Sequence, residues 1–413
     1  MLKQIEGSLG IAEAVALCRP GAVCAYPISP QTHIVENVGK LVKEGKLKEC
    51  EFINCESEFS AMSISIGAAA GGVRTYTATA SQGLLFMAEG VYNASGLGLP
   101  MVMTVASRAI GAPINIWNDH SDSLSQRDSG WLQLFCESNQ DAVDTHIMAF
   151  KIAEEVGLPV MVLMDGYVLT HAFERMDIPS QEQIDSFLPE YNPKEFLDPK
   201  QPISMGAMVG PEAFTEVKIL QQRKMAKAIG VIEKVTEEYR KLTGRNSGGL
   251  VECYNCDNAD VKIVIAGSSV GTAKDEVDRL NEQGYKVGII SLKAYRPFPY
   301  EAMKAAIGDC KNVVVLERAF SIGARGIIGP EVERSMYGTD CKIRSVVAGL
   351  GGRAILGSTI KNIADLALQG KLVEELTFVD AQPNVLNNYL KDAEGVSFAD
   401  GPIAESDIIK SVR

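Results

Sequence analysis

Short apolar runs alternate with amphipathic segments along the first half of the chain. The runs have the length and the residue content of buried strands, and the segments between them have the periodicity of helices. Strands and helices in alternation are typical of a parallel sheet covered on both faces, so this half is predicted to have an α/β fold. The predicted strands are residues 22–26, 51–55, 74–80, 100–106 and 159–164.

The alternation is interrupted in the middle of the chain. Residues 179–202 are rich in proline and polar side chains, residues 210–242 have a long charged helical pattern, and residues 243–249 read as a flexible break. We therefore predict a first domain of residues 1–248, which includes the linker helix, and a smaller α/β domain of residues 249–413. The elements predicted in the second domain are strands at 261–266, 286–291, 312–317 and 344–348 and a helix at 268–283.

Composition narrows the class of protein. A chain of 413 residues with 46% hydrophobic content can bury the cores of two domains. Its net charge of −12, without a basic patch or a lipidation pattern, argues against nucleic-acid and membrane partners. Residues 1–16 read as the start of an amphipathic helix rather than a secretory signal, and the longest apolar stretches, such as 99–106, have strand length. We expect a cytoplasmic protein.

The nine cysteines are odd in number and lie mostly inside apolar runs, so a disulfide framework is not expected. Cys253 and Cys256 form the only CxxC pair, which is either half of a zinc site or, as we favour, a coincidence. Repeated CxxC spacing is missing, so any iron-sulfur clusters belong to another chain. The GxGxxA pattern at residues 349–354 follows a late strand, and we interpret it as a structural turn rather than a nucleotide site.

One turn indicates anion binding. Residues 25–32 read as the end of a strand that opens directly into a helix, with Ser29 at the N-cap and Pro30 at the first helical position. Free N–H groups at a helix start attract an anion. The turn therefore predicts a seat for a carboxylate; the alternative is a well-capped turn with no ligand.

Longer motifs carry a resemblance to a known family. The chain resembles the alpha subunit of a heteromeric 2-oxoacid:ferredoxin oxidoreductase, of the pyruvate and 2-oxoisovalerate type. The motifs are long, occur in order and span nearly the whole chain. The matching segments are residues 26–32 (YPISPQT), 55–58 (CESE), 78–84 (ATASQGL), 107–109 (SRA), 112–122 (APINIWNDHSD), 295–299 (YRPFP) and the glycine turn at Gly349.

The resemblance implies thiamine diphosphate chemistry divided between chains. It implies a pyrimidine-binding-type parallel sheet domain, followed by a smaller transketolase C-terminal-like domain. A beta subunit would supply the diphosphate and Mg²⁺ side. The Asp165-Gly166 pair followed by Asn192 is similar to a diphosphate motif, but Met164 replaces its first Gly and Pro189 breaks the strand that would present Asn192. We therefore assign this chain half of an active site and no metal ligands.

Glu58 is the principal candidate for catalysis. It follows a predicted strand and opens a predicted helix, residues 59–70, which would place its carboxyl group in a cleft of low dielectric constant. The resemblance places Glu58 against the pyrimidine ring, where it would favour the imino tautomer by hydrogen bonding to a ring nitrogen. Burial raises the pKa of a carboxyl group, which suits a shared proton. Glu56 is the alternative, as a surface or capping acid.

Arg108 and Ser29 are the candidates for substrate binding. Arg108 ends a predicted strand, and a guanidinium can hold a carboxylate through two parallel hydrogen bonds. The resemblance implies that both residues hold the substrate carboxylate. Many relatives have Thr at the position of Ser29, and the smaller side chain leaves the size of the substrate open. Ile110 is expected to line the substrate pocket, although a core position fits it equally well.

The remaining candidates belong to neighbouring turns. Pro27, Ile28, Gln82 and Gly83 are expected to shape the cofactor cleft. His120 has either an acid-base role or a capping role at a helix that begins near residue 121.

The resemblance implies CoA-dependent oxidative decarboxylation of a 2-oxo acid, with pyruvate favoured. Electrons would pass to iron-sulfur clusters on partner subunits, which would include gamma and ferredoxin-like delta subunits and, for NAD as acceptor, a flavin subunit. Three alternatives stay open: a branched or aryl substrate such as 2-oxoisovalerate or phenylglyoxylate, a transketolase-like or dehydrogenase E1-like beta chain, and a non-catalytic assembly subunit. The joint presence of Ser29, Glu58 and Arg108 argues against the last two.

Overall fold

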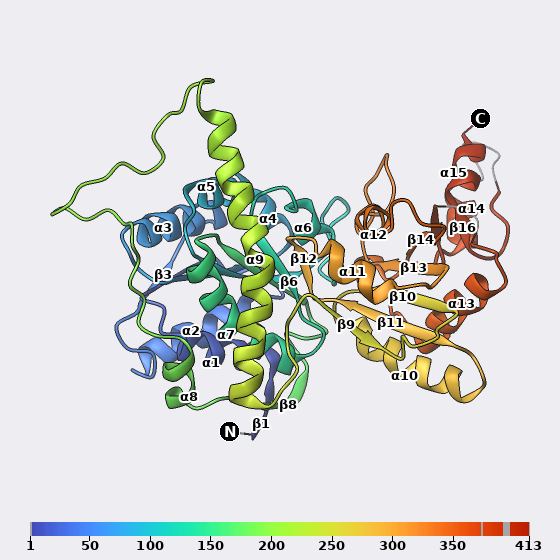
Figure 1. The fold of residues 1–413 in the computed structure, drawn as a ribbon, viewed down its shortest axis with the longest axis horizontal. Coiled ribbons are helices and arrows are strands. Elements are labelled where there is room, and N and C mark those ends of the chain that lie inside the picture. Colours follow the sequence, from blue (N-terminus) through green and yellow to red (C-terminus); the bar gives the residue numbers. More distant parts are fainter. Residues whose placement is uncertain (1, 373–374, 391–396, 413) are drawn as a thin grey trace. The chain divides into compact units, whose positions relative to one another are not determined.

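The computed structural model describes residues 2–372, 375–390 and 397–412, which form two compact units (Figure 1). The first unit comprises Met1–Leu250 and Lys293–Pro299, and the second comprises Val251–Leu292 and Tyr300–Arg413. Both are α/β units, as the alternating pattern predicts. No helix of the described residues is long and apolar enough to cross a membrane.

The first unit is built on a seven-stranded sheet in the order β12-β6-β7-β5-β4-β2-β3. All neighbours are parallel except β12 and β6. The five predicted strands are confirmed, and β6 and β12 are additions. The strands are β2 (Ala22–Ala25), β3 (Glu51–Asn54), β4 (Thr75–Thr79), β5 (Val102–Ser107), β6 (Leu132–Phe135), β7 (Val160–Asp165) and β12 (Ala294–Arg296).

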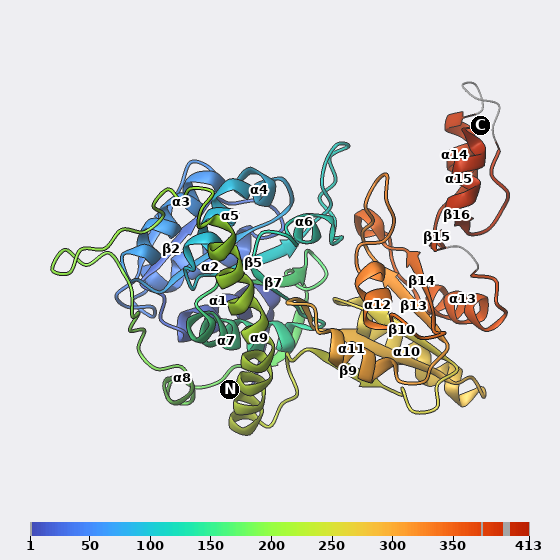
Figure 2. The ribbon, with the colours of Figure 1, turned by 45° about the horizontal axis from the view of Figure 1, so that its top comes forward.

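Helices cover both faces of this sheet (Figure 2). One group contains α1, α2 and α7, and the long α9 packs on α7; the other contains α3, α4 and α5. Because both faces are covered, every residue of β4, β5 and β7 is buried. The helices are α1 (Gly7–Leu17), α2 (Thr32–Lys43), α3 (Glu58–Ala70), α4 (Ser81–Phe86), α5 (Ala88–Leu97), α6 (Ser121–Ser125), α7 (Asn139–Val156), α8 (Gln181–Phe187) and α9 (Phe214–Thr243).

The N-terminus differs from the prediction of a helix over residues 1–16. Residues Leu2–Glu6 form a strand, β1, and α1 begins only at Gly7. Strand β1 pairs antiparallel with β8 (Phe173–Asp177) in a separate two-stranded sheet. The partner strand lies about 170 residues away, so no local pattern predicts the pairing.

The segment Lys293–Pro299 also departs from the predicted division into domains, which placed it in the second domain. Strand β12 within this segment pairs with β6 of the first unit. The ammonium group of Lys293 reinforces the connection, because its Nζ lies 3.0 Å from Glu137 Oε2 and 3.1 Å from Asp141 Oδ2. The chain therefore returns to the first unit between two segments of the second.

The second unit has a seven-stranded sheet in the order β16-β15-β14-β13-β10-β11-β9, with antiparallel strands at both edges. The predicted strands and the helix α10 are confirmed, and apolar side chains of the strands, α10 and α13 form its core. The strands are β9 (Val251–Tyr254), β10 (Val261–Ile265), β11 (Val287–Leu292), β13 (Asn312–Glu317), β14 (Lys342–Val347), β15 (Leu376–Phe378) and β16 (Ile403–Ala404). The helices are α10 (Ser269–Glu282), α11 (Tyr300–Ile307), α12 (Gly329–Ser335), α13 (Gly357–Leu368), α14 (Pro383–Leu390) and α15 (Glu405–Ser411).

Two motifs of the second unit have structural explanations. The GxGxxA segment forms a turn, in which Gly349 has a φ of 78° and its N–H donates to Asp380 Oδ2 at 2.8 Å. The helix α13 begins only at Gly357. In the CxxC pair, Cys256 is buried and its Sγ donates to the backbone oxygen of Ile289 at 3.1 Å. All nine cysteines are free thiols.

Candidate functional site

The candidate residues lie in turns that follow β2, β3, β4 and β5. These four strands are parallel neighbours, so their carboxyl ends lie at one edge of the sheet. In open parallel sheets this edge is the usual place for a ligand. The fold therefore gathers segments that are far apart in the sequence.

Glu58 is the first residue of α3, and its carboxyl group is almost completely buried. The helix begins here because Ser57 is a true N-cap, whose side chain accepts the N–H of Ser60 at 3.2 Å. Glu58 is 7% exposed, and burial raises the pKa of its carboxyl group. Glu56, in contrast, is exposed and accepts a hydrogen bond from the Ser60 hydroxyl. The geometry thus favours Glu58 over Glu56 as the acid in the cleft.

Gly83 lies directly against Glu58. A Cβ atom on Gly83 would lie 2.6 Å from both Glu58 Oε1 and Thr79 Oγ1, which is closer than side chains tolerate. Thr79 Oγ1 is buried and has no hydrogen-bond partner in the described part of the chain. Gly83 therefore allows a buried carboxyl group and an unpaired hydroxyl group to approach the backbone of the turn after β4. These groups fit the polar edge of a nitrogen heterocycle, which both donates and accepts hydrogen bonds.

Arg108 follows β5 and is only 6% exposed. Its Nη1 donates to the backbone oxygen of Ser29 at 2.8 Å, and its Nε donates to the backbone oxygen of Asn115 at 2.9 Å. Burial lowers the pKa of this guanidinium. Nη2 makes no hydrogen bond within the described residues, which leaves one donor group for a ligand. The two predicted substrate-binding residues are therefore in contact, through the backbone of Ser29.

The predicted helix start at Ser29 and Pro30 is wrong. Helix α2 begins at Thr32, and its N-cap residue is Gln31, which has helical dihedral angles. The N–H of Gln31 donates to the oxygen of Ile28 at 2.8 Å, so these residues close a turn before the helix. Gln31 Nε2 also donates to the backbone oxygen of Ala78 at 2.5 Å, which ties the turn to β4. Ser29 stays exposed, and its hydroxyl makes no hydrogen bond in the described part of the chain.

Asp122 is a site residue that sequence reasoning missed. Its Oδ2 accepts the N–H of Ser81 at 2.8 Å and that of Arg108 at 2.9 Å, and its Oδ1 accepts the N–H of Ser123 at 2.6 Å. Asp122 is fully buried, and burial raises the pKa of its carboxyl group to about 7. One carboxyl group therefore joins the turns after β4 and β5. Asp122 belongs to the family motif at residues 112–122, which is the only sequence signal that could have identified it.

His120 and Asp165 are paired. His120 Nε2 lies 2.7 Å from Asp165 Oδ1, and both side chains are buried. His120 occupies the N-cap position of α6, but its side chain does not cap the helix; Asp119 Oδ1 accepts the N–H of Ser121 instead, at 2.9 Å. Asp165 at the end of β7 therefore fastens the loop after β5.

The other candidates occupy the surrounding turns. Gln82 lies in α4, and a Cβ on Gly111 would lie 2.5 Å from its Nε2, so the turn after β4 contacts the loop after β5. Ile110 lies in the same loop, where its N–H donates to Ser121 Oγ at 3.2 Å. Pro27 is exposed and Ile28 half-buried in the turn after β2.

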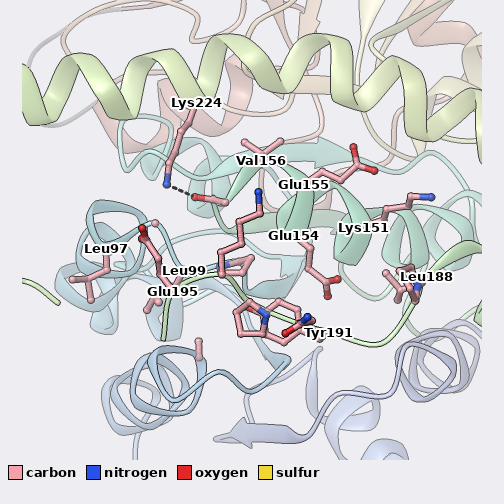
Figure 3. Close-up of a pocket in the computed structure, with 18 of the residues that line it drawn as sticks. Leu97, Leu99, Lys151, Glu154, Glu155, Val156, Leu188, Tyr191, Glu195 and Lys224 are labelled. Carbon is pink, nitrogen blue, oxygen red and sulfur yellow. Dashed lines mark hydrogen bonds between the residues drawn. The ribbon is translucent and has the colours of Figure 1, made fainter. Parts of the chain in front are cut away.

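A separate cavity of about 550 Å³ lies between the end of α7 and the irregular segment after α8 (Figure 3). None of the candidate residues lines it. One of its acidic residues, Glu154, is paired with Arg74 at 2.6 Å, and Lys224 donates to the oxygen of Gly157 at 3.1 Å. Its walls therefore serve the packing of the first unit.

The comparison with protein families gives two matches. Residues 13–239 match the family described as pyruvate flavodoxin/ferredoxin oxidoreductase, thiamine diphosphate-binding. Residues 259–360 match the pyruvate:ferredoxin oxidoreductase core domain II.

Curated relatives cover most of the chain. Pyruvate synthase subunit PorA of Methanosarcina barkeri is 41% identical, over 92% of this chain and 97% of the relative. PorA of Methanocaldococcus jannaschii is 46% identical, over 88% of this chain and 94% of the relative. Ketoisovalerate oxidoreductase subunit VorA of Pyrococcus abyssi is 38% identical, over 88% and 92%.

Solved structures share the fold at low sequence identity. A 2-oxoglutarate:ferredoxin oxidoreductase from Magnetococcus marinus has a TM-score of 0.68 at 19% identity, and the match covers 89% of this chain and 65% of that one. A split gene transketolase has a TM-score of 0.52 at 14% identity, over 89% of this chain and 99% of that one. Both matches support the predicted class of fold.

Proposed function

The chain belongs to the 2-oxoacid:ferredoxin oxidoreductase family as an alpha subunit, and we propose that its complex catalyses CoA-dependent oxidative decarboxylation of pyruvate. The buried Glu58 carboxyl group, which lies against Gly83 beside the turn that carries Arg108, is the observation that carries the proposal. The choice of pyruvate is supported by the pyruvate synthase relatives, which are 41% and 46% identical to this chain.

Glu58, Gly83 and Thr79 would hold the pyrimidine ring of thiamine diphosphate. When bound, this cofactor supplies a nucleophilic carbon and an electron sink for decarboxylation. The raised pKa of Glu58 suits a carboxyl group that shares a proton with a ring nitrogen. Gly83 allows that carboxyl group to lie against the turn after β4, and the unpaired Thr79 hydroxyl is available as a further polar contact. Pro27, Ile28 and Gln82 would border the ring.

Arg108 and Ser29 would bind the carboxylate of the 2-oxo acid. Nη2 of Arg108 makes no hydrogen bond within the described chain, and the Ser29 hydroxyl is exposed next to the backbone oxygen that Arg108 binds. A guanidinium held by two backbone oxygens is fixed in position before the substrate arrives, which lowers the entropy lost on binding. Ile110 would line the pocket on the methyl side of the substrate.

Partner chains would complete the active site. The two residues that are similar to a diphosphate motif have other surroundings in this chain: Asp165 is hydrogen-bonded to His120, and Asn192 lines the separate cavity of Figure 3. This supports a beta subunit as the source of the diphosphate and Mg²⁺ site. Exposed apolar side chains on the turns of the site, Tyr26, Ile114 and Trp117, support coverage by another chain.

Iron-sulfur clusters would reside on partner subunits, which would include gamma and ferredoxin-like delta subunits, with an added flavin subunit if NAD is the acceptor. Coenzyme A would collect the acyl group. The cytoplasmic location expected from the sequence stays a prediction.

The test is electron transfer by the native complex, purified without oxygen. We would measure CoA-dependent viologen reduction with pyruvate, 2-oxoisovalerate, 2-oxoglutarate and phenylglyoxylate in parallel. We expect the highest kcat/KM with pyruvate. Preference for 2-oxoisovalerate, which the VorA relatives keep open, would contradict the choice of substrate. No reduction with any substrate, despite bound cofactor and intact clusters, would favour an assembly subunit.

A further inference from the structure

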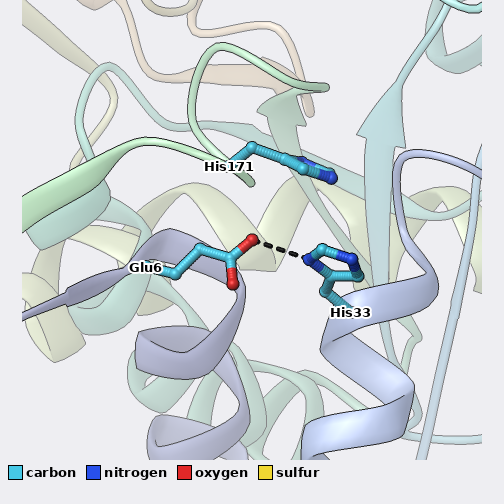
Figure 4. Close-up of side chains that lie close together, drawn as sticks. All are labelled: Glu6, His33 and His171. Atoms are coloured by element: carbon cyan, nitrogen blue, oxygen red, sulfur yellow. Dashed lines mark hydrogen bonds and ion pairs between the residues drawn. The ribbon is translucent and has the colours of Figure 1, made fainter.

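Three side chains with metal-binding atoms converge on the surface of the first unit (Figure 4). Glu6 ends β1, His33 lies in the first turn of α2, and His171 lies in the turn between β7 and β8. One potential ligand atom of each residue lies within 4.8 Å of those of the other two. No other group of three or more His, Cys, Asp or Glu residues is arranged in this way within the described chain.

The backbone holds these residues together. Glu6 pairs with Phe173 across the β1–β8 ladder, which places it two residues from His171. The N–H of Gly7 donates to Ala172, and that of Ser8 to Thr170, both at 2.9 Å. The convergence is therefore a property of the fold and does not depend on side-chain rotation alone.

Neighbouring side chains contact both histidine rings. Thr170 Oγ1 lies 2.7 Å from His171 Nδ1, and when Nδ1 carries the proton, the lone pair of Nε2 is free. Hydrogen bonding of the second ring nitrogen is the usual way in which proteins orient a metal-binding histidine. The rings of His33 and His171 lie 4.6 Å apart, and His33 Nδ1 lies 2.7 Å from Glu6 Oε1.

The charges around the cluster favour a cation. The side chain of Glu6 is only 19% exposed, and its ion-pairing partner is His33, which is charged only when protonated. Glu6 makes no salt bridge with Lys or Arg in the described part of the chain. A half-buried carboxyl group therefore faces two imidazole rings, and no Lys or Arg side chain of the described chain pairs with it.

We propose that Glu6, His33 and His171 bind a divalent transition-metal ion of the zinc class. Two imidazole nitrogens and one carboxylate oxygen are typical ligands for zinc, with a fourth position for water. Bonds of about 2.1 Å would place the ligand atoms roughly 3.4 Å apart in tetrahedral geometry. The side chains would therefore shift by about 1 Å around the ion, and the 2.7 Å contact between Glu6 and His33 would open. His33, with 45% of its side chain exposed, is free to make this adjustment.

The ion would join β1, α2 and the turn after β7. The His171 ring packs 4.7 Å from that of Tyr167, which packs 4.9 Å from Trp117 in the loop that carries Asn115. A bound ion therefore stabilises the first unit near the turn that contains Ser29. This effect does not depend on the proposed function.

The test uses the full chain after treatment with a chelator, titrated with Zn²⁺ or Co²⁺. We expect one equivalent of metal, visible cobalt ligand-field bands without a thiolate-to-cobalt charge-transfer band, and a rise in melting temperature of roughly 5–10 °C at about 100 times the dissociation constant. The missing charge-transfer band separates this site from the nine thiols.

Matched variants identify the ligands. Glu6→Gln, His33→Gln and His171→Gln should each weaken binding by about 100-fold or more, since loss of an outer hydrogen bond alone costs about 10–100-fold. Glu36→Gln, a change of the same kind on the exposed face of α2, should bind as the wild type. Circular dichroism without metal checks that each variant folds. Because His33 is exposed, His33→Gln keeps the test valid even if another variant misfolds. No binding, thiolate coordination, or variants that bind normally would each overturn the proposal.

Discussion

Gly83 and Glu58 are in such close approach that a Cβ on the glycine would fall 2.6 Å from the Glu58 Oε1 atom. Glu58 follows β3 and Gly83 follows β4, and β2 lies between these strands in the sheet. The absence of a side chain at Gly83 thus allows the buried carboxyl group to take its position.

Glu58→Gln should lower kcat by about 10²–10⁴-fold, the usual contribution of a positioned acid or base, because an amide cannot exchange a proton with the cofactor. The measurement is pyruvate-dependent viologen reduction by the assembled complex. Glu56→Gln is the control, since Glu56 is exposed two residues away. Equal activity of the two variants would remove Glu58 from its proposed role.

Gly83→Ala should lower kcat about 100-fold, because the added methyl group displaces the Glu58 carboxyl group by about 1 Å or more. It should also weaken binding of thiamine diphosphate to the complex, measured by calorimetry. Gly67→Ala is the control in α3, where an added Cβ meets open space, and it should raise the free energy of unfolding by about 0.5–1 kcal/mol. Normal cofactor binding by Gly83→Ala would contradict the contact.

Arg108→Lys should raise the KM for pyruvate by about 10–100-fold, corresponding to the roughly 1.5–3 kcal/mol of a hydrogen bond to a charged group. Lysine keeps the positive charge but cannot bind Ser29, Asn115 and a carboxylate with one planar group. Steady-state kinetics of the complex, with Arg223→Lys on the exposed surface of α9 as control, provide the test. An unchanged KM would show that the substrate carboxylate binds elsewhere.

Asp122→Asn should destabilise the first unit by about 1–3 kcal/mol at acid pH, because both oxygens of the protonated carboxyl group can accept hydrogen bonds from the three N–H donors, whereas an amide has one acceptor oxygen. The pKa of Asp122 is raised to about 7 in the folded chain, so its contribution to stability is complete below about pH 4 and is lost as the pH rises through about 7. The difference in melting temperature between wild type and variant should therefore shrink from pH 5 to pH 8, an interval of about three units. A difference that grows with pH would contradict the raised pKa of Asp122. It would mean that the hydrogen bonds from the three N–H groups favour the ionised carboxyl group more than burial disfavours it.

The sequence predicted most of the sheet strands and helices, and it predicted Glu58 as the buried acid rather than Glu56. It did not predict β1 or β12, whose partner strands lie more than 150 residues away in the chain. It also placed the start of α2 two residues too early, because Ser29 and Pro30 have the composition of a helix start. Gln31 instead bonds to β4, a contact that local preferences do not contain.

The sequence by itself determined the order of strands and helices, the class of fold and the family, because hydrophobic periodicity and motif spacing are local properties of the chain. Only the tertiary structure decided which side chains meet. Strand pairing and helix packing bring Gly83 to Glu58, and Asp122 to the N–H groups of Ser81 and Arg108. They also bring Glu6 together with His33 and His171. Such contacts join segments from about 14 to 165 residues apart, and their geometry follows from the packing of the whole first unit.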